Sequence, residues 1–128
     1  MSTTDTSEFD EWLARMVREQ GEFTVLVVLT DIGERSVTPL CSTYFHIIGD
    51  EVTWEDITVM FAGSGQDWKG AAFFPTKGRN GGPVDNPTAR LRQQELEAAV
   101  MADRMVPNDG HFFDNQGRRI KIEPEAQG

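Results

Sequence analysis

The stretch EFTVLVVLT, residues 22–30, constrains the fold of this chain more than any other part of its sequence. Successive side chains of an extended strand point to opposite faces, and here both faces are apolar. The two apolar rows are Phe23, Val25, Val27 and Leu29 on one face and Leu26 and Val28 on the other. Because both rows must leave water, the sequence predicts a central strand that is covered on both sides.

Two segments have the pattern of helices. Ser7 can cap a helix in which apolar residues recur at helical spacing, and Gly21 would end it. The apolar positions are Phe9, Trp12, Leu13, Met16 and Val17. Asn86 and Pro87 form an N-cap and first-turn pair, which predicts a second helix near 87–105.

Shorter segments are expected to join the same sheet, because they are rich in apolar residues and are bounded by turn residues. The expected strands are residues 41–48, 70–75, 111–113 and 118–124, and the last two flank a hairpin turn at the sequence DNQG. Gly33 and Pro39 predict a loop over residues 31–40.

Residues 53–62 fit two kinds of secondary structure. Thr53 and Asp56 have the spacing of a capping box, which would start a short helix. The same segment is rich in β-branched residues, which favour a strand. We expect a strand over residues 56–62, with the helix as the alternative.

The order of these elements is a helix, several strands joined by short connections, a second helix and a hairpin. It predicts an α+β fold: an antiparallel sheet of about four to six strands, with the N-terminal helix and the helix near 87–105 packed against it. A chain of 128 residues fits one domain. We expect this domain over residues 7–124, between flexible ends at 1–6 and 125–128.

The charge of the chain limits its partners. The net charge is −9, and all of the excess lies in residues 1–60, where twelve acidic residues face three basic ones. An acidic chain without a concentrated basic stripe repels nucleic acid. The sequence also has no apolar stretch of membrane-spanning length and no secretory signal pattern. We expect a small, acidic, soluble, cytoplasmic protein with no nucleic acid or membrane partner.

No residue pattern indicates catalysis, a cofactor or a metal. The glycines near Gly65 lack the lysine and hydroxyl pair of a phosphate loop and the third glycine of a dinucleotide fingerprint. Cys41 is the only cysteine, and its odd separation from His46 places the two on opposite faces of a strand. His46 and His111 lack metal-ligand spacing. The sequence favours a protein that is not an enzyme and predicts that Cys41 is inert packing.

The strongest candidate for ligand binding is the glycine-rich segment 77–92. It places basic side chains ahead of a helix whose first N–H groups can hold an anion. The candidate ligands of a phosphate or carboxylate are Lys77, Arg79, Asn86, Arg90 and Arg92. Asp85 would compete for the same donors, and a solvated connector is the alternative interpretation.

The second helix is apolar on two sides, which indicates deep burial or a partner. Its two patches are Leu96, Ala99 and Val100 on one side and Leu91, Ala98, Ala102 and Met105 on the other. Two-fold homodimers are the most common oligomers, so a homodimer is expected alongside an unidentified protein partner. The expected interface residues are Trp54, Trp68, Leu96, Val100 and Met105.

These observations predict a non-catalytic module that binds a protein partner or associates with itself. The alternative is a small-molecule binding protein, or a small enzyme, that holds an anionic ligand with the basic glycine-rich loop at 77–92. A concave pocket with convergent polar groups would favour the alternative, and a concentration-dependent mass would favour the module.

Overall fold

A computed structural model describes residues 7–33, 37–48, 52–79, 81–103 and 105–121. It confirms the α+β prediction, with a four-stranded antiparallel sheet in the order β2-β1-β3-β4. The elements are α1 (Glu8–Gln20), β1 (Phe23–Ile32), β2 (Val37–Ile47), α2 (Trp54–Ala62), β3 (Gly70–Thr76), α3 (Asn86–Ala102), the 3-10 helix η1 (Val106–Asp109) and β4 (His111–Asp114).

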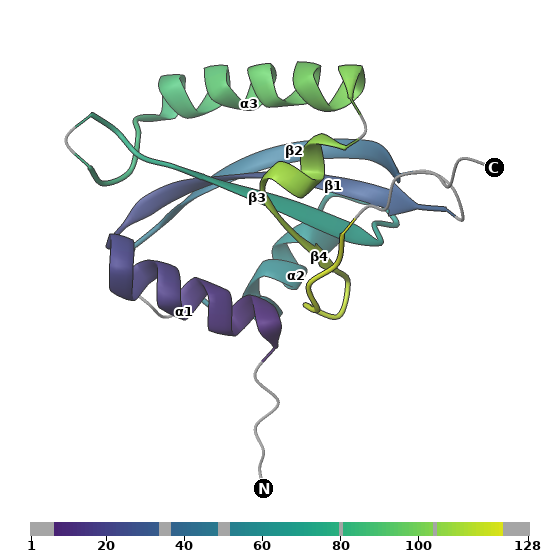
Figure 1. Ribbon diagram of the computed structural model, residues 1–128, viewed down its shortest axis with the longest axis horizontal. Helices are drawn as coiled ribbons and strands as arrows, with labels where there is room; N and C mark the ends of the chain where they lie inside the picture. The colour runs from purple at the N-terminus through teal and green to yellow at the C-terminus, as the bar shows by residue number, and fades with distance from the viewer. Residues whose placement is uncertain (1–6, 34–36, 49–51, 80, 104, 122–128) are drawn as a thin grey trace, which may run out of the picture.

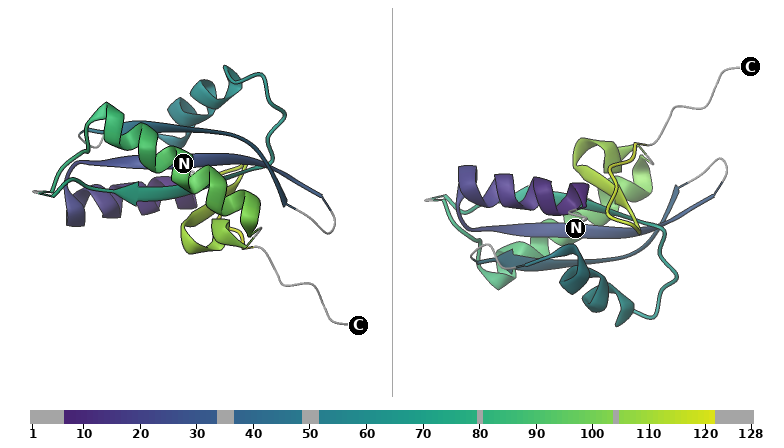
Figure 2. Two further views of the ribbon diagram at one scale, coloured as in Figure 1. Left: turned by 90° about the horizontal axis from the view of Figure 1, so that it is seen from above. Right: turned by 90° about the horizontal axis from the view of Figure 1, so that it is seen from below.

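Helices cover both faces of the sheet (Figure 1). α1 and α2 lie against one face, which we call the lower face, and α3 lies across the other, the upper face. Seen from above, α3 runs obliquely over the strands (Figure 2). β1 pairs with β2 on one side and β3 on the other, and every residue from Phe23 to Thr30 is buried. The predicted central strand, covered on both sides, is therefore confirmed.

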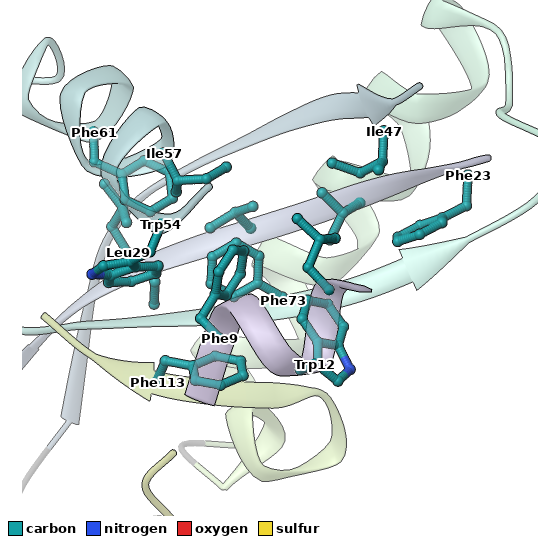
Figure 3. Close-up of a cluster of buried hydrophobic side chains, with 14 residues drawn as sticks. Phe9, Trp12, Phe23, Leu29, Ile47, Trp54, Ile57, Phe61, Phe73 and Phe113 are labelled. Atoms are coloured by element: carbon teal, nitrogen blue, oxygen red, sulfur yellow. The ribbon is translucent and has the colours of Figure 1, made fainter. Parts of the chain in front are cut away.

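The lower face is packed by an aromatic core (Figure 3). Phe73 of β3 is fully buried, and its ring lies within 6.4 Å, centroid to centroid, of five other aromatic rings. Those rings belong to Phe9, Trp12, Trp54, Phe61 and Phe113. The core thereby joins both lower helices to β3 and β4 through aromatic contacts.

The prediction of a strand over residues 56–62 is wrong, because this segment belongs to α2. The Thr53 hydroxyl accepts from the Asp56 N–H, and the Asp56 carboxylate accepts from the Thr53 N–H, which completes the capping box. The helical spacing also brings one row of side chains into the aromatic core. Burial of this row outweighs the strand preference of the β-branched residues. Its members are Trp54, Ile57 and Phe61.

The predicted loop at residues 31–40 is mostly strand. β1 continues to Ile32 and β2 begins at Val37, while residues 34–36 lie outside the described residues. The pairing of β1 and β2 shifts at Leu40, which forms a bulge. Pro39 is accommodated because β2 is an edge strand, where a missing N–H is tolerated.

The helix predicted near 87–105 is confirmed as α3, with shifted ends. Asp85, rather than Asn86, is the N-cap, and the helix ends at Ala102. In the predicted terminal hairpin, Phe113 and Arg119 form a single bridge across the DNQG turn, and residues 122–124 of its second strand lie outside the described residues. The flexible ends expected at 1–6 and 125–128 lie outside the described residues.

Candidate functional site

The basic side chains of the glycine-rich loop do not converge on one point. Lys77 donates from Nζ to the carbonyl oxygen of Gln20 at 2.7 Å, at the end of α1. Arg92 donates to the Thr76 hydroxyl and to the Lys77 carbonyl. Lys77 thus joins the loop to α1, and Arg92 joins α3 to the end of β3, so both cations have partners within the chain.

The N-terminal end of α3 is occupied by the side chain of Asp85. Its carboxylate accepts from the Thr88 N–H at 2.8 Å, and hydrogen bonds from Thr88 lower the pKa of this carboxyl. A carboxylate of the chain thus takes the position that an external anion would use. Arg79 and Arg90 are exposed, and neither has a hydrogen-bond or ion-pair partner among the residues that the structure describes.

Asn86, the remaining candidate ligand, belongs to a chain of hydrogen bonds on the upper face. The Val84 N–H donates to the Thr24 hydroxyl at 3.0 Å, and that hydroxyl lies 2.8 Å from Nδ1 of His46. Nε2 of His46 lies 2.8 Å from Oδ1 of Asn86. If Thr24 donates to Nδ1 and Nε2–H donates to Asn86, every group is satisfied. The network accounts for both His46 and Asn86 as structural residues.

Cys41, His46 and His111, the other side chains that could react or bind a metal, pack against the rest of the protein. Cys41 packs against the lower aromatic core, and burial raises the pKa of its thiol. His46 lies on the other face of the sheet, as the odd spacing predicted. The ring of His111 lies 4.7 Å from that of Trp12. Within the described residues, no three His, Cys, Asp or Glu side chains are grouped so that they could hold a metal ion.

An open hollow of about 860 Å³ lies between α1 and α2, and its lining is mostly polar. It contains Trp54 and Trp68, two of the expected interface residues. Trp54 is only 9% exposed and belongs to the aromatic core, and Trp68 is partly buried against it. Asp10, also in the lining, accepts from the Ser7 hydroxyl and from the Trp54 N–H, which ties α1 to α2. The packing of the chain itself therefore accounts for Trp54, Trp68 and Asp10 in this hollow.

The other expected interface residues lie under α3. Val100 is 3% exposed, and Leu96 and Met105 are partly buried, so these three side chains face the protein itself. The exposed apolar side chains of α3 are instead Leu91 and Met101. Met101 was not among the expected residues, although it follows Ala98 and Leu91 on the same side at helical spacing.

The outer edge of β2 is a second unpartnered surface. Among the described residues, no strand pairs with β2 other than β1. From Cys41 to Ile47 the pairing with β1 is regular, so this part of the edge is extended and without a bulge. Natural edge strands prevent pairing with another chain through charged side chains, Pro or bulges. In β2, Pro39 and the bulge at Leu40 lie near its start, and the strand contains no Asp, Glu, Lys or Arg.

An apolar groove of about 220 Å³ lies between β2 and the C-terminal half of α3. Glu97 accepts from the Ser42 hydroxyl at its margin, and Gln93 donates to the same hydroxyl. The other main lining residues are Pro39, Leu40, Val100 and Met101. We call the outer edge of β2, this groove, Arg90 and Met101 together the edge surface, and it is the candidate functional site.

Comparison of the chain with protein family models, with curated proteins and with solved structures finds no match. No activity or partner is therefore transferred from a relative. In the part of the chain that the structure describes, no helix is both long enough and apolar enough to cross a membrane.

Proposed function

We propose that this protein is a non-catalytic interaction module that associates with itself through the edge surface. The observation that carries the proposal is the outer edge of β2, which pairs with no strand among the described residues and lies beside an apolar groove. An exposed edge of this kind presents unpaired N–H and C=O groups, which are a template for pairing with another strand.

The side chains around this edge fit a contact with protein. Met101 is 76% exposed at the rim of the groove, and a flexible thioether adapts to the surface packed against it. Apolar side chains grouped beside an open strand edge are a feature of interaction sites. The anionic-ligand alternative is less well supported, because Lys77, Asn86 and Arg92 are bonded within the chain.

Light scattering over a range of protein concentrations tests the proposal. We expect a dimer at tens of micromolar, within the range of ordinary protein complexes. Met101→Glu places a carboxylate beside Glu97 and should shift the protein toward the monomer. Val59→Glu is the matched control, because Val59 is 69% exposed on α2, outside the edge surface. A monomer at every concentration, with both variants folded, would contradict the proposal.

A further inference from the structure

We infer that two copies join edge to edge, β2 against β2, about a two-fold axis close to Thr43. The two sheets then form one continuous antiparallel sheet. This geometry rests on the self-association proposed above and specifies the contact that produces it.

The backbone of β2 fits this arrangement. A strand that pairs antiparallel with its own copy forms a two-fold symmetric contact, in which each chain supplies the same groups. With the axis at Thr43, the residues from Cys41 to Phe45 pair with their copies inside the regular segment from Cys41 to Ile47. Pro39 and the bulge at Leu40 lie just before it and end the region in which regular pairing can continue.

Side chains opposite one another across this axis are compatible. With Thr43 facing its own copy, Cys41 lies opposite Phe45 of the second copy, and Ser42 lies opposite Tyr44. No like charges meet along the strands, because the paired residues 41–45 include no acidic or basic residue. Uncharged and aromatic cross-strand pairs favour association.

α3 provides complementary charge above the same axis. Glu97 is bonded to Ser42, and Asn86 is bonded to His46, so α3 runs antiparallel to β2. A helix rises about 1.5 Å per residue and a strand about 3.3 Å. Between the two bonded pairs, the midpoint of Arg90 and Glu97 therefore lies about one strand residue from Ser42, above Thr43. A two-fold axis there brings Arg90 of each copy opposite Glu97 of the other.

The position of α3 allows this contact. α3 lies over β2 and β1, and paired strands are about 4.8 Å apart, so the two copies of α3 come within the 8–10 Å spacing of packed helices. Arg90 is exposed and has no partner among the described residues, so it is available for an ion pair. The start of α3 then lies beside the second copy's groove, and this additional contact helps an interface reach the area of about 800 Å² per partner that stable complexes bury.

Cysteine crosslinking tests the geometry in the full chain. In a Cys41→Ser background, Thr43→Cys places two thiols across the axis, at the separation of directly opposed residues in an antiparallel pair. We expect rapid formation of a covalent dimer under mild oxidation. Glu11→Cys, on the exposed side of α1, is the control and should crosslink only slowly. Rapid crosslinking of Leu91→Cys, with none at position 43, would overturn the geometry in favour of contact through the outer side of α3.

Charge reversal tests the second contact. Arg90→Glu and Glu97→Arg should each weaken the dimer about tenfold, because each places like charges together at two symmetric positions. The double variant Arg90→Glu with Glu97→Arg should recover most of the lost affinity. A dimer that shows neither the Thr43 crosslink nor this recovery contradicts only the geometry, whereas a protein that is monomeric throughout contradicts the self-association as well.

Discussion

The two faces of the sheet are held by different kinds of interaction. On the lower face, α1 and α2 pack through aromatic rings, and Phe73 contacts five of them. On the upper face, only Ala89 and Val100 of α3 are buried. Hydrogen bonds from β1 and β2 fix its position instead, through Thr24, Ser42 and His46.

This difference indicates that one face supplies the stability of the fold and the other sets the orientation of α3. Apolar contacts are strong but tolerate sliding, since they have little directional preference. Hydrogen bonds contribute less net free energy, but they are lost when a donor and its acceptor move apart. We infer that the lower face supplies most of the stability, and that the upper face fixes where α3 lies relative to the edge of β2.

The largest expected effect comes from a pair of neighbouring phenylalanines on opposite faces of β3. Phe73→Ala leaves a cavity in the aromatic core and should lower the free energy of unfolding by about 3–5 kcal/mol. Phe74→Ala, on the upper face where Phe74 is only partly buried, should cost about half of that or less. Urea denaturation of both variants measures the comparison, and equal losses would contradict the assignment of stability to the lower face.

A smaller effect is expected from the hydroxyls of two threonines on the upper face of β1. Thr24 and Thr30 are both fully buried, so replacing each by valine keeps the shape. Thr24→Val leaves the Val84 N–H and His46 Nδ1 without this partner and should cost about 2 kcal/mol. Thr30→Val removes one longer hydrogen bond, to the Gly70 carbonyl, and should cost about 1 kcal/mol.

Urea denaturation again gives both values, and chemical shifts of α3 residues provide the more specific measurement. Only the Thr24 variant should change the shifts of α3, because only Thr24 is connected to it through His46 and Asn86. If both variants leave α3 unchanged, the hydrogen bonds do not fix its position.

The smallest expected effect is a pH dependence at the margin of the aromatic core. Burial, with Arg119 and Arg15 nearby, lowers the pKa of His111 below its ordinary value of 6.5. The unfolded chain therefore binds a proton first as the pH falls, so stability is lost below about pH 6.5. His111→Gln should remove part of this loss. Urea denaturation of the variant and the parent at pH 7.5 and pH 5.5 measures how much stability each loses between the two pH values. An equal loss in both proteins would contradict the role of His111.

Elements with one strong signal could be predicted from the sequence. The apolar residues of β1 and the Ser7 cap of α1 act locally, so their consequences are visible in the chain itself. At α2, two local signals disagreed: β-branched residues favoured a strand, and the capping box favoured a helix. The conflict was decided by burial of Trp54 and Ile57 against α1 and β3, which depends on distant residues.

The candidate site depended still more on distant contacts. His46 meets Asn86 across forty residues of sequence, and Ser42 meets Glu97 across an even longer separation. Only the positions of β2 and α3 in the folded chain bring these pairs together. The unpartnered edge of β2 depends on the strand order, which the sequence did not predict.

The position of β1 between two partner strands has a consequence for the order in which parts of the protein open. Amides of β1 are covered by helices on both faces and by strands on both sides, so they should exchange with deuterium only when the whole protein unfolds. α3 is connected mainly by side-chain hydrogen bonds, so it can separate from the sheet in a smaller opening. Its amides should then exchange faster than those of β1, and their rate reports how often the upper side of the sheet is briefly uncovered.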